Sequence, residues 1–154
     1  MSRLPLVLVA LVAAALLATG CGSSGPSAAD AYKTSFTPLN QEIIKTGNDV
    51  GDAVTTANTK PDAQIGVDFA RLSDRAATLA GQLAKLAPPK ELQADHQLLV
   101  GGLRKEAGNL NRIAEAAVKG DAVAAKAASQ DTVTAAAGIR DPRLRIATQL
   151  KLTP

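Results

Sequence analysis

From Ser27 onward, apolar residues recur at intervals of three and four, which is the spacing of one face of an α-helix. The first stripe predicts a helix over residues 28–58, and Ser27 followed by Asp30 has the spacing of a capping box at its start. The apolar positions of this stripe are Tyr32, Phe36, Leu39, Ile43, Gly47, Val50 and Val54. Tyr32 and Phe36 lie one turn apart, and we expect them in the core, with contact at a bilayer surface as the alternative.

Two further long helices follow from stripes of the same kind. The start signal Thr59, Pro61, Asp62 predicts a helix over residues 61–87, which ends where prolines 88 and 89 disfavour helical backbone. A third helix is predicted over residues 89–119, with a glycine after its last turn.

The C-terminal region has a weaker, alanine-rich pattern. It predicts a fourth helix over residues 121–139, capped by Asp121, and a short last helix over residues 142–150 with Asp141 as its cap and Pro142 in its first position. Residues 139–142, Ile-Arg-Asp-Pro, are expected to break or kink the helical arm.

Short connections between long helices make neighbours antiparallel, so the sequence predicts an all-α fold, an up-down-up-down four-helix bundle. A longer helical hairpin that completes its core by dimerising is the alternative. The thin stripe of residues 121–139 keeps that alternative open, because an alanine-rich face buries little area and leaves an apolar groove exposed.

Composition narrows the classes of function. Aromatic residues make up only 2% of the chain, so we expect a core of Leu, Ile, Val and Ala. The chain carries 17 basic and 14 acidic side chains, a formal charge of +3, and loss of Arg3 with a cleaved leader would leave +2. Such a weak charge, with almost no aromatic residues for stacking, argues against a nucleic-acid partner. The single cysteine excludes an intrachain disulfide.

The N-terminus has the features of an export signal: a basic start, an apolar run over residues 4–18, and small residues before Cys21. Residues 18–21, Ala-Thr-Gly-Cys, resemble the lipobox of bacterial lipoproteins. The resemblance implies cleavage between Gly20 and Cys21, a diacylglyceryl group on the Cys21 sulfur, and in some members acylation of its new amino group. The predicted organisation is a signal peptide (1–20), a lipidated cysteine with a Gly/Ser tether (21–27) and a helical bundle (28–154).

Other interpretations of Cys21 have less support in the sequence. An uncleaved signal anchor would leave it as an unmodified thiol, but no charged stop-transfer flank follows the apolar run. A catalytic thiol needs an activating base nearby, and a metal site needs more ligands than the chain clusters.

His96 is the one histidine, and it falls on the apolar stripe of the third helix. It is a candidate ligand for a metal or haem, with Glu91 or Asp95 as acidic neighbours, or a proton switch. The alternative is a partly buried, hydrogen-bonded histidine of the bundle, near the turn at prolines 88 and 89. No Glu-x-x-His or Cys-x-x-Cys-His motif accompanies it.

Two other features call for an explanation. Glycines inside helices, at 47 and 51 and at 101 and 102, each cost about 1 kcal/mol relative to alanine. They indicate either close helix approach or a bend or groove for a ligand or partner helix. A basic cluster near the C-terminus is either a solvated helix face or a contact with anionic lipid headgroups; it consists of Arg140, Arg143, Arg145 and Lys151.

Residues 83–121 resemble a pattern of small exported lipoproteins from high-GC Gram-positive bacteria: a Leu-rich turn, two prolines, a helix with a histidine in its second turn, and an Ala-rich stretch closing in Gly-Asp. The histidine, here His96, is shared in that group. The resemblance implies export and a helical fold, and it implies no catalytic activity.

Together these features predict a lipoprotein anchored at the outer face of the cytoplasmic membrane. We expect a non-enzymatic helical bundle without a cofactor, which binds a protein partner or an apolar small ligand or has a structural role in the cell envelope. A nucleophile with an oriented base cannot be assembled from one histidine and a lipidated cysteine. The alternative function is a metal- or haem-binding sensor that uses His96.

Overall fold

The computed structural model describes residues 27–152, and this part of the chain is all-helical, without a strand. The predicted signal peptide, Gly20, Cys21 and almost all of the tether lie outside the described residues. The elements are α1 (Ala28–Thr56), the 3₁₀ turn η1 (Ala57–Thr59), α2 (Asp62–Leu83), the 3₁₀ turn η2 (Lys90–Leu92), α3 (Gln93–Val118), α4 (Ala122–Ala135) and α5 (Ala137–Gln149).

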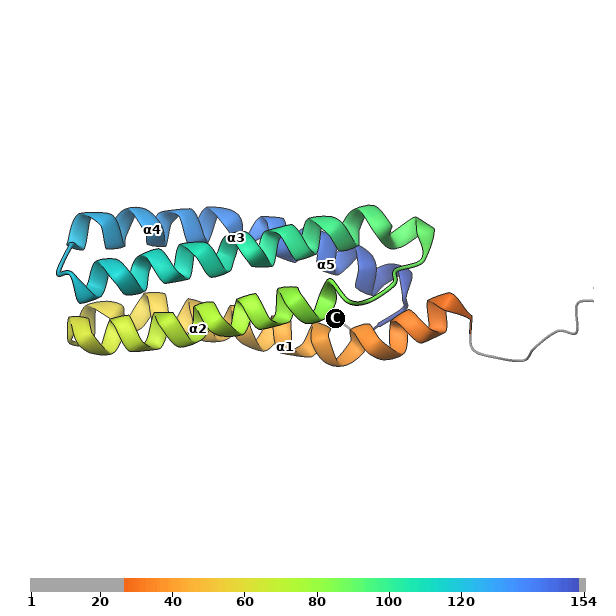
Figure 1. Ribbon diagram of the computed structural model, residues 1–154, viewed down its shortest axis with the longest axis horizontal. Coiled ribbons are helices and arrows are strands. Elements are labelled where there is room, and N and C mark those ends of the chain that lie inside the picture. The colour runs from red at the N-terminus through yellow and green to blue at the C-terminus, as the bar shows by residue number, and fades with distance from the viewer. Residues whose placement is uncertain (1–26, 153–154) are drawn as a thin grey trace, which may run out of the picture.

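The helices run antiparallel, and α4 and α5 together form the fourth arm of an up-down-up-down bundle (Figure 1). α2 and α3 form the central pair, α1 packs on α2, and α4 and α5 pack on α3. The predicted all-α bundle is therefore confirmed. The bundle is open on one side. α1 packs mainly on α2 and the α4–α5 arm mainly on α3, so α1 and this arm have little contact with each other.

Caps fix where several helices begin and end. The Asp30 amide donates to Ser27 Oγ (3.1 Å) while the Ser27 amide donates to the Asp30 carboxylate (3.3 Å), so the capping box is present. Gly120 has a φ of 68°, which an L-residue rarely adopts, and ends α3. The Ala124 amide then donates to Asp121 Oδ1 (2.9 Å) at the start of α4.

The core consists of two clusters along the bundle axis. One, near the α1 N-terminus, includes Phe36, Leu99 and Ile146; the other, near the α2 N-terminus, includes Phe69 and Leu110. All of their buried residues lie between residues 32 and 150, so the helical body has a core of its own. The aromatic residues are buried among the aliphatic ones, and the core position expected for Tyr32 and Phe36 is confirmed, with their rings stacked 5.5 Å apart.

The α2 C-terminus lies earlier than expected. The prediction extended the helix to residue 87, but α2 ends at Leu83 and the chain turns through residues 84–86. Proline disfavours helical backbone in the residue before it, and both Ala87 and Pro88 precede a proline, so the helix ends before them; both lie outside any helix. The Leu86 amide donates to the Leu83 carbonyl within this turn (2.9 Å).

The predicted break at residues 139–142 is wrong. α4 ends at Ala135, and α5 runs continuously from Ala137 through Asp141 and Pro142, so Asp141 is not a helix cap. Pro142 has no amide hydrogen to donate to the Gly138 carbonyl one turn earlier. That carbonyl lies against Gly102 of α3, where a built Cβ would be 2.8 Å from its oxygen. The absence of a side chain at Gly102 thus lets α5 approach α3 closely, and the helical arm is interrupted at Ala136 instead of at the proline.

Candidate functional site

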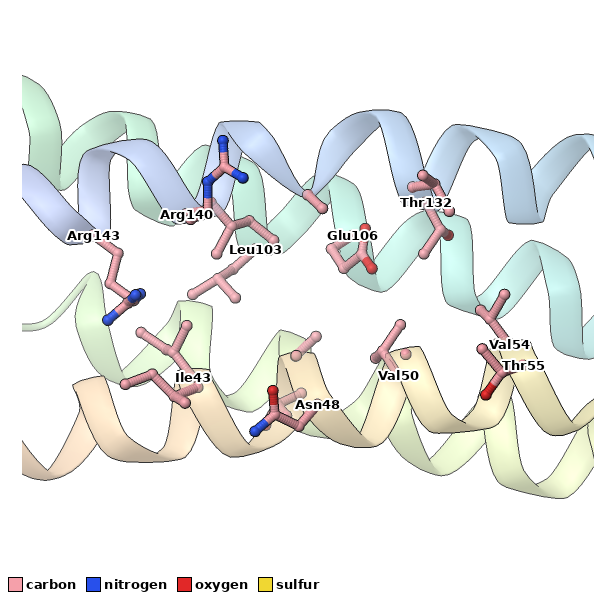
Figure 2. A pocket seen from close by; sticks show the side chains of 18 residues that line it. Ile43, Asn48, Val50, Val54, Thr55, Leu103, Glu106, Thr132, Arg140 and Arg143 are labelled. Carbon is pink, nitrogen blue, oxygen red and sulfur yellow. The ribbon is translucent and has the colours of Figure 1, made fainter. Parts of the chain in front are cut away.

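A groove of about 510 Å³ runs between α1 and the α4–α5 arm, with α2 and α3 at its floor. It forms where the bundle is open, and Figure 2 shows side chains from both walls facing one another across it. A volume of this size is within the range of small-molecule sites. The groove agrees with the sequence-based expectation that the alanine-rich fourth arm would leave apolar surface uncovered.

The walls of the groove are mostly apolar. Ile43, Val50 and Val54 line the α1 wall, and Leu103 of α3 lies at the floor (Figure 2). Val133 of α4 and Ile139 of α5 contribute to the lining of the other wall. Gly47 and Gly51 also line the α1 wall, and no atom of residues 27–152 outside their own helix turn lies within 4 Å of a Cβ built on either. These two glycines therefore widen the groove, whereas Gly102 serves close helix approach.

Two buried polar groups that have no hydrogen-bond partner within residues 27–152 interrupt this apolar lining. The Glu106 side chain extends from α3 into the groove (Figure 2), yet the residue is only 7% exposed and its Oε2 atom has no hydrogen-bond partner within the described residues. Burial raises the pKa of Glu106 to about 7, because a low-dielectric site disfavours the charged carboxylate. Thr132 of α4, 3% exposed, also has a buried hydroxyl for which residues 27–152 supply no partner.

Neither Glu106 nor Thr132 was predicted from the sequence as a site residue. A signal for Glu106 was available, because it lies three residues after Leu103 and four before Leu110, on the buried side of α3. An acidic residue at such a position is buried with a partner or marks a site. Thr132 had no comparable signal, since the stripe of its helix is weak.

Arginine side chains lie at the α5 end of the groove. Arg143 extends towards α1 beside Ile43, whereas the Arg140 guanidinium points away from α1 (Figure 2). Arg143 Nη1 donates to Asn40 Oδ1 (3.1 Å), and burial lowers the pKa of the guanidinium. Asn40 is 1% exposed, and its Nδ2 finds no acceptor in the part of the chain that the structure describes.

The four residues of the predicted basic cluster do not form one patch. Arg140 pairs with the adjacent Asp141 (3.0 Å), and Arg145 pairs with Asp95 of α3 (2.8 Å). Lys151 lies after the last helix in left-handed backbone, with a φ of 52°. Arg143 belongs to the groove, so only Arg140 and Arg143 share a site.

His96 lies in the core at the end of the bundle that carries Ser27. It is 6% exposed, and its Nδ1 is 2.9 Å from the Tyr32 hydroxyl. Burial lowers the pKa of His96 and raises that of Tyr32 to about 12, so both groups favour their neutral forms. In the neutral histidine with Nδ1 unprotonated, the tyrosine hydroxyl donates this bond.

The acidic neighbours considered for His96 do not gather around it. Asp95 is paired with Arg145, and Glu91 lies exposed in η2. Within residues 27–152 no group of three or more histidine, cysteine or acidic residues could hold a metal ion. Among the same residues, no helix combines the length and the apolar character required to cross a membrane.

We compared the chain with known protein families, curated proteins and solved structures, and none of the three comparisons found a match. Its function is therefore argued from its own residues.

Proposed function

We propose that the protein is an exported, lipid-anchored helical bundle that binds an apolar small ligand in the groove between α1 and the α4–α5 arm, without catalysing a reaction. The observation that carries the binding role is the groove itself, with Glu106 buried at its floor. Export and anchoring at the outer face of the cytoplasmic membrane rest on the sequence of residues 1–21.

The residues that line the groove are those expected of a ligand site, and a simple packing defect would not require them. Apolar walls provide the free energy of ligand binding, about 25 cal/mol for each Å² of apolar surface removed from water. A buried carboxyl and a buried hydroxyl that have no partner within residues 27–152 cost stability, and in a native structure such groups call for a functional explanation. The glycines at positions 47 and 51 weaken α1 while enlarging the groove, which fits the same role.

The geometry of His96 gives no comparable support to the metal- or haem-binding alternative. Its Nδ1 is engaged by Tyr32, and its acidic neighbour Asp95 is engaged by Arg145. We therefore assign His96 a structural role in this proposal.

Ligand binding is tested with the neutral fluorophore N-phenyl-1-naphthylamine, whose emission rises in apolar surroundings. The probe is titrated into residues 21–154 carrying Cys21→Ser, which removes the predicted lipid attachment. Gly51→Leu places a side chain in the groove and is expected to abolish the increase in probe emission. Gly101→Leu adds the same side chain to an exposed position of α3 without near neighbours, and the increase in probe emission is expected to be the same as without the substitution. Equal binding by all three proteins would contradict a groove site.

Anchoring is tested separately on the full chain in a bacterial host that processes lipoproteins. Mass spectrometry of the membrane-extracted protein is expected to show an N-terminus at Cys21 with a diacylglyceryl mass. Cys21→Ser should release the protein from the membrane fraction. A full-length, unmodified product in the membrane would overturn the anchoring proposal and leave the binding proposal intact.

A further inference from the structure

Resting on the proposed function, we propose that the ligand of the groove is an anionic single-chain amphiphile. A medium-length alkyl chain would lie along the apolar walls, and a carboxylate, sulfonate or phosphate head would bind the guanidinium of Arg143 at the α5 end.

Arg143 is the cation best placed to receive an anion. It is partly buried, it reaches into the groove beside Ile43, and it has no carboxylate within 4.0 Å among the described residues. Within residues 27–152, its one side-chain hydrogen bond goes to a neutral amide oxygen, that of Asn40. A guanidinium has five N–H donors in a planar fork suited to carboxylate and phosphate, so donors remain for a ligand.

The other arginines of α5 show what Arg143 lacks. Arg140 and Arg145 each pair with an aspartate, at 3.0 and 2.8 Å, and both are exposed. Arg143 thus combines partial burial with the absence of an anionic partner in residues 27–152. A ligand anion would supply the missing charge.

Asn40 holds Arg143 at this end of the groove. Its amide oxygen accepts from Arg143 Nη1 (3.1 Å), while Asn40 itself is 1% exposed and is not among the residues that line the groove. This bond fixes one N–H of the guanidinium and leaves the others for a ligand.

The rest of the groove suits an alkyl chain. From Ile43 to Val54 the α1 wall extends about 16 Å at 1.5 Å per residue. Glu106 lies away from the arginine end, with Leu103 between them (Figure 2). A head at Arg143 therefore stays apart from this carboxyl, and the chain would cover Glu106 in its neutral form.

The test is displacement of N-phenyl-1-naphthylamine from residues 21–154 with Cys21→Ser by three ten-carbon competitors, all below their micellar concentrations: decanoate, decanol and decyltrimethylammonium. Decanoate is expected to bind about tenfold more tightly than the cation, as a charge-assisted hydrogen bond predicts. Arg143→Gln should remove this preference, measured as the ratio of the decanoate and cation affinities, whereas Arg143→Lys should retain part of it. Arg145→Gln, on the same helix but outside the groove, is the matched control. Circular dichroism verifies that each variant is folded.

The outcomes separate the two proposals. If the fluorophore binds but all three competitors displace it equally, or the cation is preferred, the anionic ligand is overturned and the apolar site stands. Equal losses in Arg143→Gln and Arg145→Gln would also overturn it, since the effect would then be one of overall charge. If calorimetry detects neither fluorophore nor decanoate binding, both proposals are overturned.

Discussion

Gly102 of α3 lies against the backbone of Gly138 of α5, and a Cβ built on Gly102 would be 2.8 Å from the Gly138 carbonyl oxygen and 3.2 Å from its carbon. Because backbone atoms cannot rotate away as a side chain can, Gly102→Ala must push α5 off α3. We expect a loss of about 1–3 kcal/mol in the free energy of unfolding, as for overpacked cores. Urea unfolding followed by circular dichroism measures it.

Gly101 provides the control at the adjacent position. No atom of the described chain outside its own helix turn lies within 4 Å of a Cβ built there, so Gly101→Ala should stabilise the protein by about 1 kcal/mol through helix propensity. Destabilisation of both variants to the same extent would show that the close approach of α5 is not what Gly102 provides.

The long helices and their caps could be predicted because their signals are local. The capping box at Ser27 and the glycine at 120 depend on residues within one turn, and both predictions are confirmed. The break of the fourth arm was misplaced, because Pro142 was the strongest local signal and yet lies inside α5, where the helix continues past it. The close approach of Gly102 to Gly138 joins residues more than 30 apart in sequence and has no local signal.

The candidate site was predictable only in outline. The weak stripe of residues 121–139 indicated an uncovered apolar face, and the groove lies there. Which polar groups enter it depends on how helices rotate against one another, and that is set by packing across the whole bundle. The sequence grouped Arg143 with Arg145 by proximity along the chain, but on a helix residues two apart point in different directions.

The hydrogen bond between the Tyr32 hydroxyl and His96 Nδ1 is expected to stabilise the fold. Tyr32→Phe removes the hydroxyl and leaves a buried ring nitrogen unpaired, which should cost about 1–3 kcal/mol in the free energy of unfolding. Thermal and urea unfolding provide the measurement. Fluorophore binding in the groove should not change, because neither residue lines it.

A double-mutant cycle isolates this bond from other effects. In the double variant Tyr32→Phe with His96→Leu, no unpaired polar group remains at this position, so the combined loss should be smaller than the sum of the two single losses. Strict additivity would mean that the two residues act independently, and would reopen the question of why His96 is buried.

The glycines of the α1 wall should show a conflict between stability and binding. Gly47→Ala and Gly51→Ala meet no atom within 4 Å in the described chain outside their own helix turn, and each should raise the free energy of unfolding by about 1 kcal/mol. Each added methyl group also narrows the groove, so fluorophore affinity should fall in both variants. Gly101→Ala, with the same gain in helix propensity outside the groove, should leave affinity unchanged. A stabilised Gly51→Ala variant that binds more tightly would contradict the assigned groove.

Glu106 should make the stability of the protein depend on pH. Its pKa is about 7 in the folded state and 4.5 in the unfolded chain, so between these values the folded state holds the proton and the unfolded state releases it. The contribution of Glu106 to stability therefore falls as pH rises from 4.5 to 7, by about 3 kcal/mol at 1.36 kcal/mol per pKa unit, and this contribution is constant on either side of the range. His96 acts in the opposite direction, because its lowered pKa makes stability fall as the pH decreases below 6.5.

Glu106→Gln keeps the size of the side chain and removes its ionisation. At pH 8 the variant should be more stable than the wild type, by up to about 3 kcal/mol, and at pH 4 the two should be nearly equal. Urea unfolding from pH 4 to pH 8 measures both profiles. The matched control is Glu91→Gln, at an exposed position, which should follow the wild-type profile. If Glu106→Gln retained the loss of stability between pH 4.5 and 7, another group would be responsible, and Glu106 would not be the buried carboxyl that a groove ligand covers.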